Sequence, residues 1–147
     1  MPHWLTDQTL DPAALLADVA SAGCGATSLF LGTVRSSSED GDIEAIEYSA
    51  YPEMAEAEFE RIVMEAQARW PLARIALRHR TGYIATGEAS IAIAVASPHR
   101  ADAYDCSRYL IEETKARVPL WKKERLASGA ARWAVPSAVS REPSAHA

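Results

Sequence analysis

The chain has 147 residues, with 15 basic and 20 acidic side chains, and its formal net charge is −5. This length fits one domain with a hydrophobic core, and the acidic balance argues against general binding to nucleic acid. No apolar run approaches a membrane span, and the first residues lack the basic and apolar regions of a signal peptide, so we expect a cytoplasmic protein.

The cysteines and histidines show no pattern typical of a disulfide framework or of a metal site. Cys24 and Cys106 are far apart and form no CxxC pair, which fits buried thiols in a reducing compartment better than a disulfide. The four histidines have no metal-ligand spacing. We therefore expect no metal site.

The N-terminal part of the chain predicts one helix and two strands. Asp11 followed by Pro12 is typical of a helix start, and Gly23 is expected to end that helix. Residues 26–35 and 43–50 have strand character, and the residues between them form a polar loop.

A second helix is predicted to begin at Pro52. Within this helix, Met54 and Met64 are assigned to core or helix packing rather than to a cofactor site. Its apolar residues recur at helical spacing: Ala55, Phe59, Ile62, Val63 and Ala66. Short strands at 74–79 and 83–86 follow. The His79-Arg80-Thr81-Gly82 motif between them is interpreted mainly as a corner between strands, with a functional site as the alternative.

The clearest strand is 89–97. One of its faces holds Ile91, Ile93 and Val95, and the other holds Ala92, Ala94 and Ala96. Such a strand is expected to be central and covered on both sides, with one cover approaching closely. Ser97-Pro98 is expected to open a third helix that runs to about Lys115. Extended chain follows through Trp121 and again near Trp133.

This order of elements predicts an α+β fold with three helices and a mainly antiparallel or mixed sheet. We expect one domain over residues 1–135. The tail 136–147 is small and polar, and we expect it to be disordered.

The segment Lys115–Arg125 has the most distinctive charge pattern in the chain. It carries five cationic side chains against one acid, in a protein of negative net charge, which indicates a site for an anion. Lys115 and Lys122 can converge on one pocket if the chain turns from helix to extended near Pro119. A lysine in such a pocket can have a lowered pKa and act as acid, base or nucleophile. The alternative is a solvated helix end followed by a surface loop.

Two shorter motifs also place cations where an anion could bind. Gly32-Thr33-Val34-Arg35 lies at a strand end, where arginine can hold a phosphate with a fork of donors; the alternative is a surface arginine on an edge strand. Ser97-Pro98-His99-Arg100 puts two cations in a first helical turn, against the helix dipole. That arrangement is tolerable if an anion binds there; the alternative is a solvent-facing pair.

Together these motifs resemble the large, catalytic subunit of molybdopterin synthase, in the family's order and over nearly the whole domain. Singly the motifs are weak, but jointly they are highly specific. They are Phe30-Leu31-Gly32-Thr33-Val34-Arg35, Glu47-Tyr48-Ser49-Ala50-Tyr51-Pro52-Glu53-Met54-Ala55, His79-Arg80-Thr81-Gly82, Gly87-Glu88, Ser97-Pro98-His99-Arg100 and Lys115 with Val118-Pro119-Leu120-Trp121-Lys122-Lys123-Glu124. Ser49, where the family often has an acid, and the short acidic loop 38–42 depart from the family pattern.

The resemblance implies a hammerhead-like subdomain and a heterotetramer: a homodimer of large subunits with one small ubiquitin-like sulfur-carrier subunit at each end. The implied reaction is a sulfur transfer that converts cyclic pyranopterin monophosphate to molybdopterin. Sulfur would arrive as a thiocarboxylate on the C-terminal Gly-Gly of the small subunit, so no further cofactor is implied.

By motif match, Lys115 and Lys122 would be the catalytic lysines. The residues that contact the substrate or line its pocket would be Thr33, Val34, Arg35, His99, Arg100, Lys115, Lys122, Lys123 and Glu124. His99 and Lys115 are sixteen positions apart, and no Gly or Pro lies between Arg100 and Lys115. A continuous helix of that length spans about 24 Å. Either the helix is broken, or two copies of the chain share each site.

Two other classes of function stay open at this stage. One is a non-catalytic docking module for a ubiquitin-like sulfur carrier, and the other is a phosphate-ligand protein unrelated to sulfur. The convergent cations favour the enzyme over the docking module, because docking alone has no need of them. A co-purifying partner that ends in Gly-Gly would exclude the phosphate-ligand protein.

Overall fold

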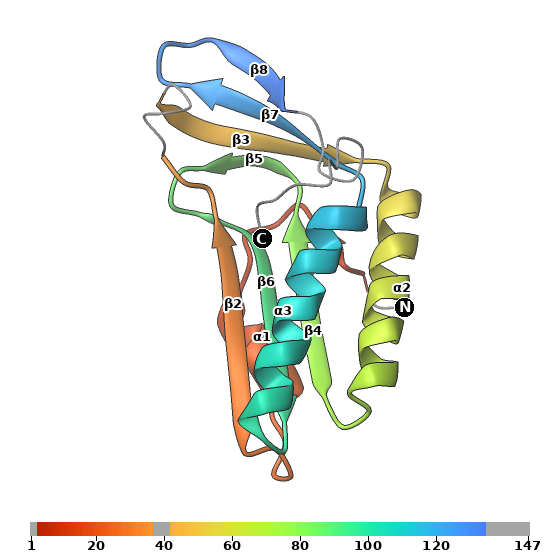
Figure 1. Ribbon diagram of the computed structural model, residues 1–147. Helices are drawn as coiled ribbons and strands as arrows, with labels where there is room; N and C mark the ends of the chain where they lie inside the picture. The colour runs from red at the N-terminus through yellow and green to blue at the C-terminus, as the bar shows by residue number, and fades with distance from the viewer. Residues whose placement is uncertain (1–2, 37–41, 135–147) are drawn as a thin grey trace, which may run out of the picture.

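The structure is a computed structural model that describes residues 3–36 and 42–134, which form two sheets and three helices (Figure 1). The first sheet has the strand order β1-β4-β6-β2. Its strands are β1 (Leu5–Thr6), β4 (Arg74–Arg80), β6 (Ala89–Ser97) and β2 (Ala26–Thr33). The pairs β4–β6 and β6–β2 are antiparallel, whereas β1 pairs with β4 in parallel.

The second sheet has the order β5-β3-β7-β8 and is antiparallel throughout. Its strands are β5 (Gly82–Ala85), β3 (Ile43–Ala50), β7 (Leu120–Leu126) and β8 (Ala131–Ala134). It crosses one end of the first sheet (Figure 1). The predicted α+β class with three helices and mixed or antiparallel sheets is confirmed.

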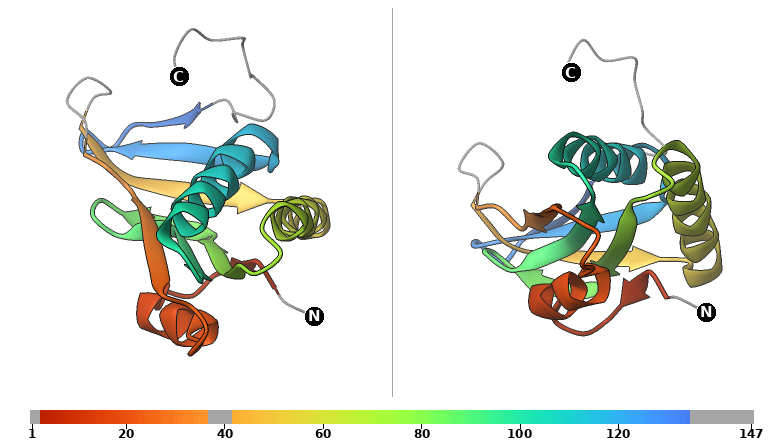
Figure 2. Two further views of the ribbon diagram at one scale, coloured as in Figure 1. Left: turned by 60° about the horizontal axis from the view of Figure 1, so that its bottom comes forward. Right: turned by 90° about the horizontal axis from the view of Figure 1, so that it is seen from below.

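The helices cover both faces of the first sheet. Figure 2 shows α1 (Pro12–Val19) on one face, and α3 (Arg100–Arg117) with α2 (Pro52–Arg69) on the other. Helix α1 begins where Asp11-Pro12 predicts. The Asp11 side chain accepts a hydrogen bond from the Ala14 amide, and proline occupies the first turn.

Strand β6 is the centre of the packing, as its sequence predicts. Its isoleucines and valine join the main core with residues of α2 and α3, such as Phe59 and Leu110. Its alanine face lies in a second cluster with Leu15 and Val19 of α1. The small alanine side chains let α1 approach closely.

Several element ends differ from the expectation. Helix α1 ends at Val19, before Gly23. Strand β2 ends at Thr33, before Arg35. Helix α3 begins at Arg100 because Ser97 still pairs with Ala26 in the sheet, and it continues to Arg117. His99 is its N-cap residue, without a side-chain capping bond.

Of the two roles expected for Met54 and Met64, core or helix packing, a place in the core is excluded, because these residues are 58% and 63% exposed on α2. The five other apolar residues predicted for this helix are buried. The tail 136–147 and residues 37–41 of the polar loop lie outside the described residues. No helix in the described ranges is long and apolar enough to cross a membrane.

Candidate active site

A cavity of about 260 Å³ lies where the two sheets meet the C-terminal end of α3. Strands β2, β3, β4, β6 and β7 contribute to its wall with α3. Six of the nine predicted site residues line it: Thr33, Val34, Arg35, Lys115, Lys122 and Glu124. Residues near position 33 and near position 120 thus meet around one space.

The two predicted lysines meet because the chain changes direction after α3. Lys115 lies in the last turn of the helix, and Val118 already has an extended backbone. The residue before a proline disfavours helical geometry, so Pro119 ends the helix and β7 begins at Leu120. Strand β7 then carries Lys122 back to the cavity.

The cavity lowers the pKa of both lysines. Partial desolvation at the cavity lowers the pKa of Lys115, although the residue as a whole is exposed, and the nearby charge of Lys122 lowers it further. Burial also lowers the pKa of Lys122, while Glu124 opposes that change. Lys122 is the more enclosed of the two, and its Nζ lies 5.7 Å from the ring centroid of Tyr48, its cross-strand neighbour. Lys115 remains exposed at the cavity mouth.

Arg35 and Glu124 are held at the cavity wall by neighbouring groups. The main chain of Val34 bonds to Gly87 and Glu88 in the turn after β5, which fixes the position of the exposed Arg35 beside it. The carboxylate of Glu124 accepts a hydrogen bond of 2.7 Å from Arg132 on β8.

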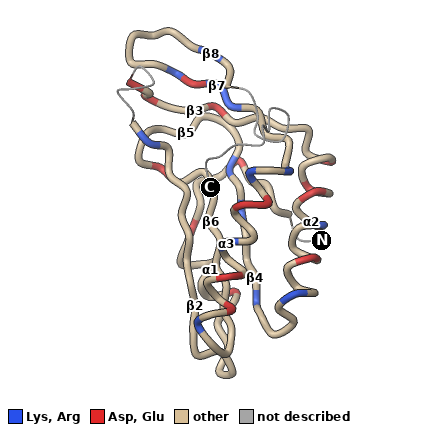
Figure 3. The backbone as a smooth tube through the Cα atoms, viewed as in Figure 1, with Lys and Arg blue, Asp and Glu red and all other residues tan. Residues whose placement is uncertain are grey.

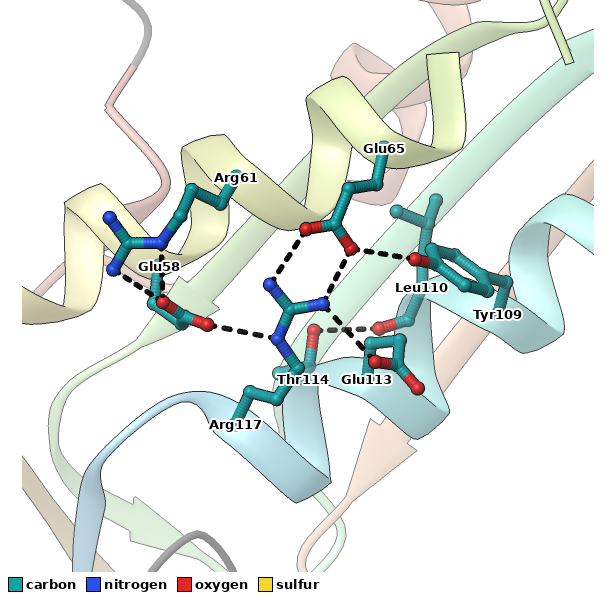
Figure 4. Close-up of polar contacts among 8 residues, drawn as sticks. All are labelled: Glu58, Arg61, Glu65, Tyr109, Leu110, Glu113, Thr114 and Arg117. Carbon is teal, nitrogen blue, oxygen red and sulfur yellow. Dashed lines mark hydrogen bonds and ion pairs between the residues drawn. The ribbon is translucent and has the colours of Figure 1, made fainter. Parts of the chain in front are cut away.

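The other cations of the basic segment do not serve the cavity. Figure 4 shows Arg117 bonded to Glu58, Glu65 and Glu113, which come from α2 and α3. Figure 3 shows that acidic and basic positions are interspersed along α2. The prediction that this whole segment handles an anion is therefore too broad, because its arginine at 117 joins two helices.

Lys123 and Arg125 lie on the opposite face of β7 from Lys122, since side chains alternate along a strand. Lys123 stacks over the Trp133 ring at 5.4 Å, and Arg125 pairs with Glu47 at 2.9 Å. Lys123 is not among the residues that line the cavity, although it was predicted to contact the substrate.

His99 and Arg100 do not reach the cavity of their own chain either. Helix α3 runs unbroken from Arg100 to Arg117, which separates them from Lys115 by about 24 Å. Of the two explanations that the sequence left open, a broken helix is excluded.

The floor of the cavity is polar and buried, and its residues were not predicted for the site. They are Tyr48, His79 and Ser90. Ser90 donates to the carbonyl of Gly32 at 3.2 Å and is hydrogen-bonded to Tyr48. Burial raises the pKa of Tyr48.

The interpretation of His79–Gly82 as a corner is confirmed, since β4 ends there and Gly82 has a φ of 96°. His79 of this corner also lines the cavity, and no local sequence signal shows this, because it depends on how the second sheet packs against the first.

The fold and the cavity define an α+β protein with a lysine-lined pocket between two sheets. Residues 5–117 match the family model described as MoaE protein. The chain belongs to this family, that of the catalytic subunit of molybdopterin synthase.

Similar proteins with this name occur in bacteria and animals. The chain is 40% identical over 125 residues to the molybdopterin synthase catalytic subunit of Halalkalibacterium halodurans, covering 85% of this chain and 80% of that protein. It is 46% identical over 106 residues to the human protein of the same name, covering 72% of this chain and 56% of the human one.

Solved structures agree with this assignment. Molybdopterin synthase from Staphylococcus aureus superposes with a TM-score of 0.85 at 32% identity, covering 91% of this chain and 98% of that one. A complex of subunits 1 and 2 of the molybdopterin-converting factor from Helicobacter pylori shares the fold, with a TM-score of 0.73 at 21% identity over 88% of each chain.

Proposed function

We propose that this chain is the catalytic subunit of a cytoplasmic molybdopterin synthase. In this function it transfers sulfur to cyclic pyranopterin monophosphate from the C-terminal thiocarboxylate of a small ubiquitin-like subunit. The convergence of Lys115 and Lys122 on one cavity is the observation that carries the proposal.

The lysine pair suits an anionic sulfur donor. A thiocarboxylate is negatively charged and is attracted to two neighbouring ammonium groups, most strongly where water is partly excluded. The same ammonium groups can stabilise charge that develops on the substrate and can deliver a proton. Since the partner brings the sulfur, the proposed reaction needs no resident cofactor.

We further propose that each active site is shared by two copies of the chain. Arg35 supplies one phosphate contact at the cavity rim, and His99 and Arg100 of a second copy supply the others. Support comes from the unbroken α3, which keeps His99 and Arg100 away from the lysines of their own chain.

The direct test is to mix the purified chain with the thiocarboxylated small subunit and the cyclic pterin, and to measure molybdopterin. The matched control is the same subunit with an ordinary C-terminal carboxylate, which binds but has no sulfur to give. Binding of the thiocarboxylated subunit without product would favour the docking module and contradict the proposal.

A further inference from the structure

His79 is a buried polar residue of the cavity for which the proposed chemistry has no use. Its side chain is 4% exposed and lines the cavity floor. The ring meets the edge of Tyr48 at 5.0 Å between centroids and lies 6.3 Å from Phe59. Burying an imidazole among aromatic rings is costly unless its nitrogens find hydrogen-bond partners.

One ring nitrogen of His79 is committed to the main chain. Nδ1 lies 2.8 Å from the carbonyl oxygen of Arg80. A carbonyl oxygen only accepts, so Nδ1 carries the proton, and in the neutral ring Nε2 has a free lone pair. Burial, together with the charges of Lys122 and Lys115, lowers the pKa of His79 to about 4 against the opposing bond to Arg80. The ring is therefore neutral at pH 7.

The second nitrogen faces the cavity. Within residues 3–36 and 42–134, no group forms a hydrogen bond to Nε2. In the same ranges, the side-chain polar atoms that are fully enclosed without a partner are Arg80 Nε and Ser97 Oγ. Since Nε2 is not one of these, it remains accessible from the space that His79 lines.

The charged groups around this lone pair offer a ligand mostly donors. Lys115, Lys122 and Arg35 can donate hydrogen bonds but cannot accept them. Glu124 can accept, but its carboxylate already accepts a hydrogen bond from Arg132. A purely anionic ligand would be satisfied by the cations, whereas a ligand that also has N–H or O–H groups needs an acceptor.

The serine hydroxyl of the floor already has a partner in the main chain. Ser90 donates to the Gly32 carbonyl, and its hydrogen bond with Tyr48 acts to lower the pKa of that phenol against the effect of burial. His79 Nε2 is thus a neutral side-chain acceptor that no protein group in the described part of the chain occupies.

We propose that His79 is a specificity-determining residue, whose neutral imidazole accepts at Nε2 a hydrogen bond from an uncharged N–H or O–H group of the ligand. The inference rests on the proposed function and adds to it the residue that distinguishes a heterocyclic or hydroxylated phosphate ester from a bare anion. The cations bind the charged end of such a ligand, and His79 accepts a hydrogen bond from its uncharged part.

Two variants separate the roles of the two ring nitrogens. His79→Asn keeps an N–H near the position of Nδ1 and removes the acceptor at Nε2. His79→Gln places an amide oxygen near the position of Nε2. Both are assayed in the full chain together with its thiocarboxylated partner, and thermal unfolding measures the stability of each.

We expect His79→Asn to raise KM for the cyclic pterin about tenfold, with a much smaller change in kcat, because a ligand donor loses its partner. His79→Gln should stay within about threefold of the wild type. Inhibition by inorganic phosphate should be unchanged in both, since phosphate is held by the cations. An unchanged KM in a folded His79→Asn variant, or equal losses for pterin and phosphate, would overturn the inference.

Nitrogen NMR of the wild-type protein provides a readout that does not depend on folding of the variants. We expect a protonated Nδ1 and a bare Nε2 at pH 7, and a change of the Nε2 signal when the pterin binds. A ring protonated at Nε2 would overturn the inference and leave the sulfur transfer standing. A wild-type chain that makes no molybdopterin would overturn the proposed function and this inference together.

Discussion

Lys115 and Lys122 differ in how the protein surrounds them, and for the proposed reaction this difference predicts different parts for the two lysines. Lys122 lies against the Tyr48 ring within the cavity, whereas Lys115 stays exposed at its mouth. In the proposed reaction the sulfur donor enters from outside, so we expect it to meet Lys115 first. We expect Lys122 to lie beside the bound substrate.

Replacing Lys115 with alanine should abolish most product formation while leaving the fold intact. The side chain is exposed at a helix end, so little packing is lost, but the charge that meets the sulfur donor disappears. Product formation, partner affinity and thermal unfolding are the three measurements. Lys123→Ala is the matched control, because Lys123 does not line the cavity. Near-normal turnover by Lys115→Ala would refute the catalytic role.

The lowered pKa of Lys115 should be visible by NMR titration of its Cε carbon. We expect a midpoint below the ordinary 10.5, because burial and the charge of Lys122 both favour the neutral amine. Lys122→Met removes one of these two causes, so the midpoint of Lys115 should rise toward 10.5 in that variant. A midpoint that does not move would show that the two lysines are not coupled.

At the scale of elements, Arg117 fixes the end of α3 that carries Lys115. Its guanidinium bonds to Glu58 and Glu65 of α2 and to Glu113 one turn earlier (Figure 4). Glu65 also accepts a hydrogen bond of 2.8 Å from Tyr109. Without the guanidinium, three carboxylates would face one another between the helices.

Arg117→Ala should lower the free energy of unfolding by roughly 1–2 kcal/mol, since a partly buried network loses its central cation. Arg108→Ala is the control on the same helix. Its bond to Glu112 is highly exposed, with side-chain accessibilities of 77% and 59%, so stability should hardly change. Chemical denaturation measures both variants, and equal losses would contradict the special role of Arg117.

The contribution of the Arg117 network to the free energy of unfolding should also depend on pH. The hydrogen bond from Arg117, followed by that from Tyr109, lowers the pKa of Glu65 from 4.5 to about 2. A carboxyl group with a depressed folded pKa stabilises the fold above its unfolded pKa and loses this effect as the pH falls through the folded one. The stability difference between the wild type and Arg117→Ala should therefore shrink between pH 4.5 and pH 2. A difference that stays constant over this range would contradict the assignment.

At the scale of the whole molecule, a shared site predicts that two inactive chains can repair each other. In a mixed dimer of Lys115→Ala and Arg100→Ala chains, one of the two sites keeps both groups intact. Random mixing makes half of the dimers mixed, so about a quarter of wild-type activity should return. If subunits exchange freely and the mixture stays as inactive as either variant, the site is not shared.

Local patterns predicted much of the architecture. The bounds of β3 and β6 and the start of α2 follow the sequence because alternation, proline positions and helical spacing are local signals. The small side chains of β6 predicted that one cover approaches closely, and the structure shows that α1 packs on this alanine face. The paired lysines could be predicted too, because proline forces a turn between them.

The remaining parts of the site depend on partners far along the chain. Arg117 resembles an anion-binding residue until Glu58 and Glu65, more than fifty positions earlier, are brought beside it. His79 looks like a strand end until the second sheet closes over it and Tyr48 meets its ring. Such contacts are set by tertiary packing, which local propensities do not encode.

The unbroken α3 also sets a fixed dimension for the assembled enzyme. An α-helix turns by about 100° and rises by ~1.5 Å with each residue. One added residue between Arg100 and Lys115 would therefore rotate the lysine away from the cavity while the cations at the other end stayed in place. If the two ends of α3 serve opposite sites, the helix acts as the spacer that sets the distance between the two reaction centres, and single insertions or deletions within it should be tolerated far less than substitutions on its exposed face.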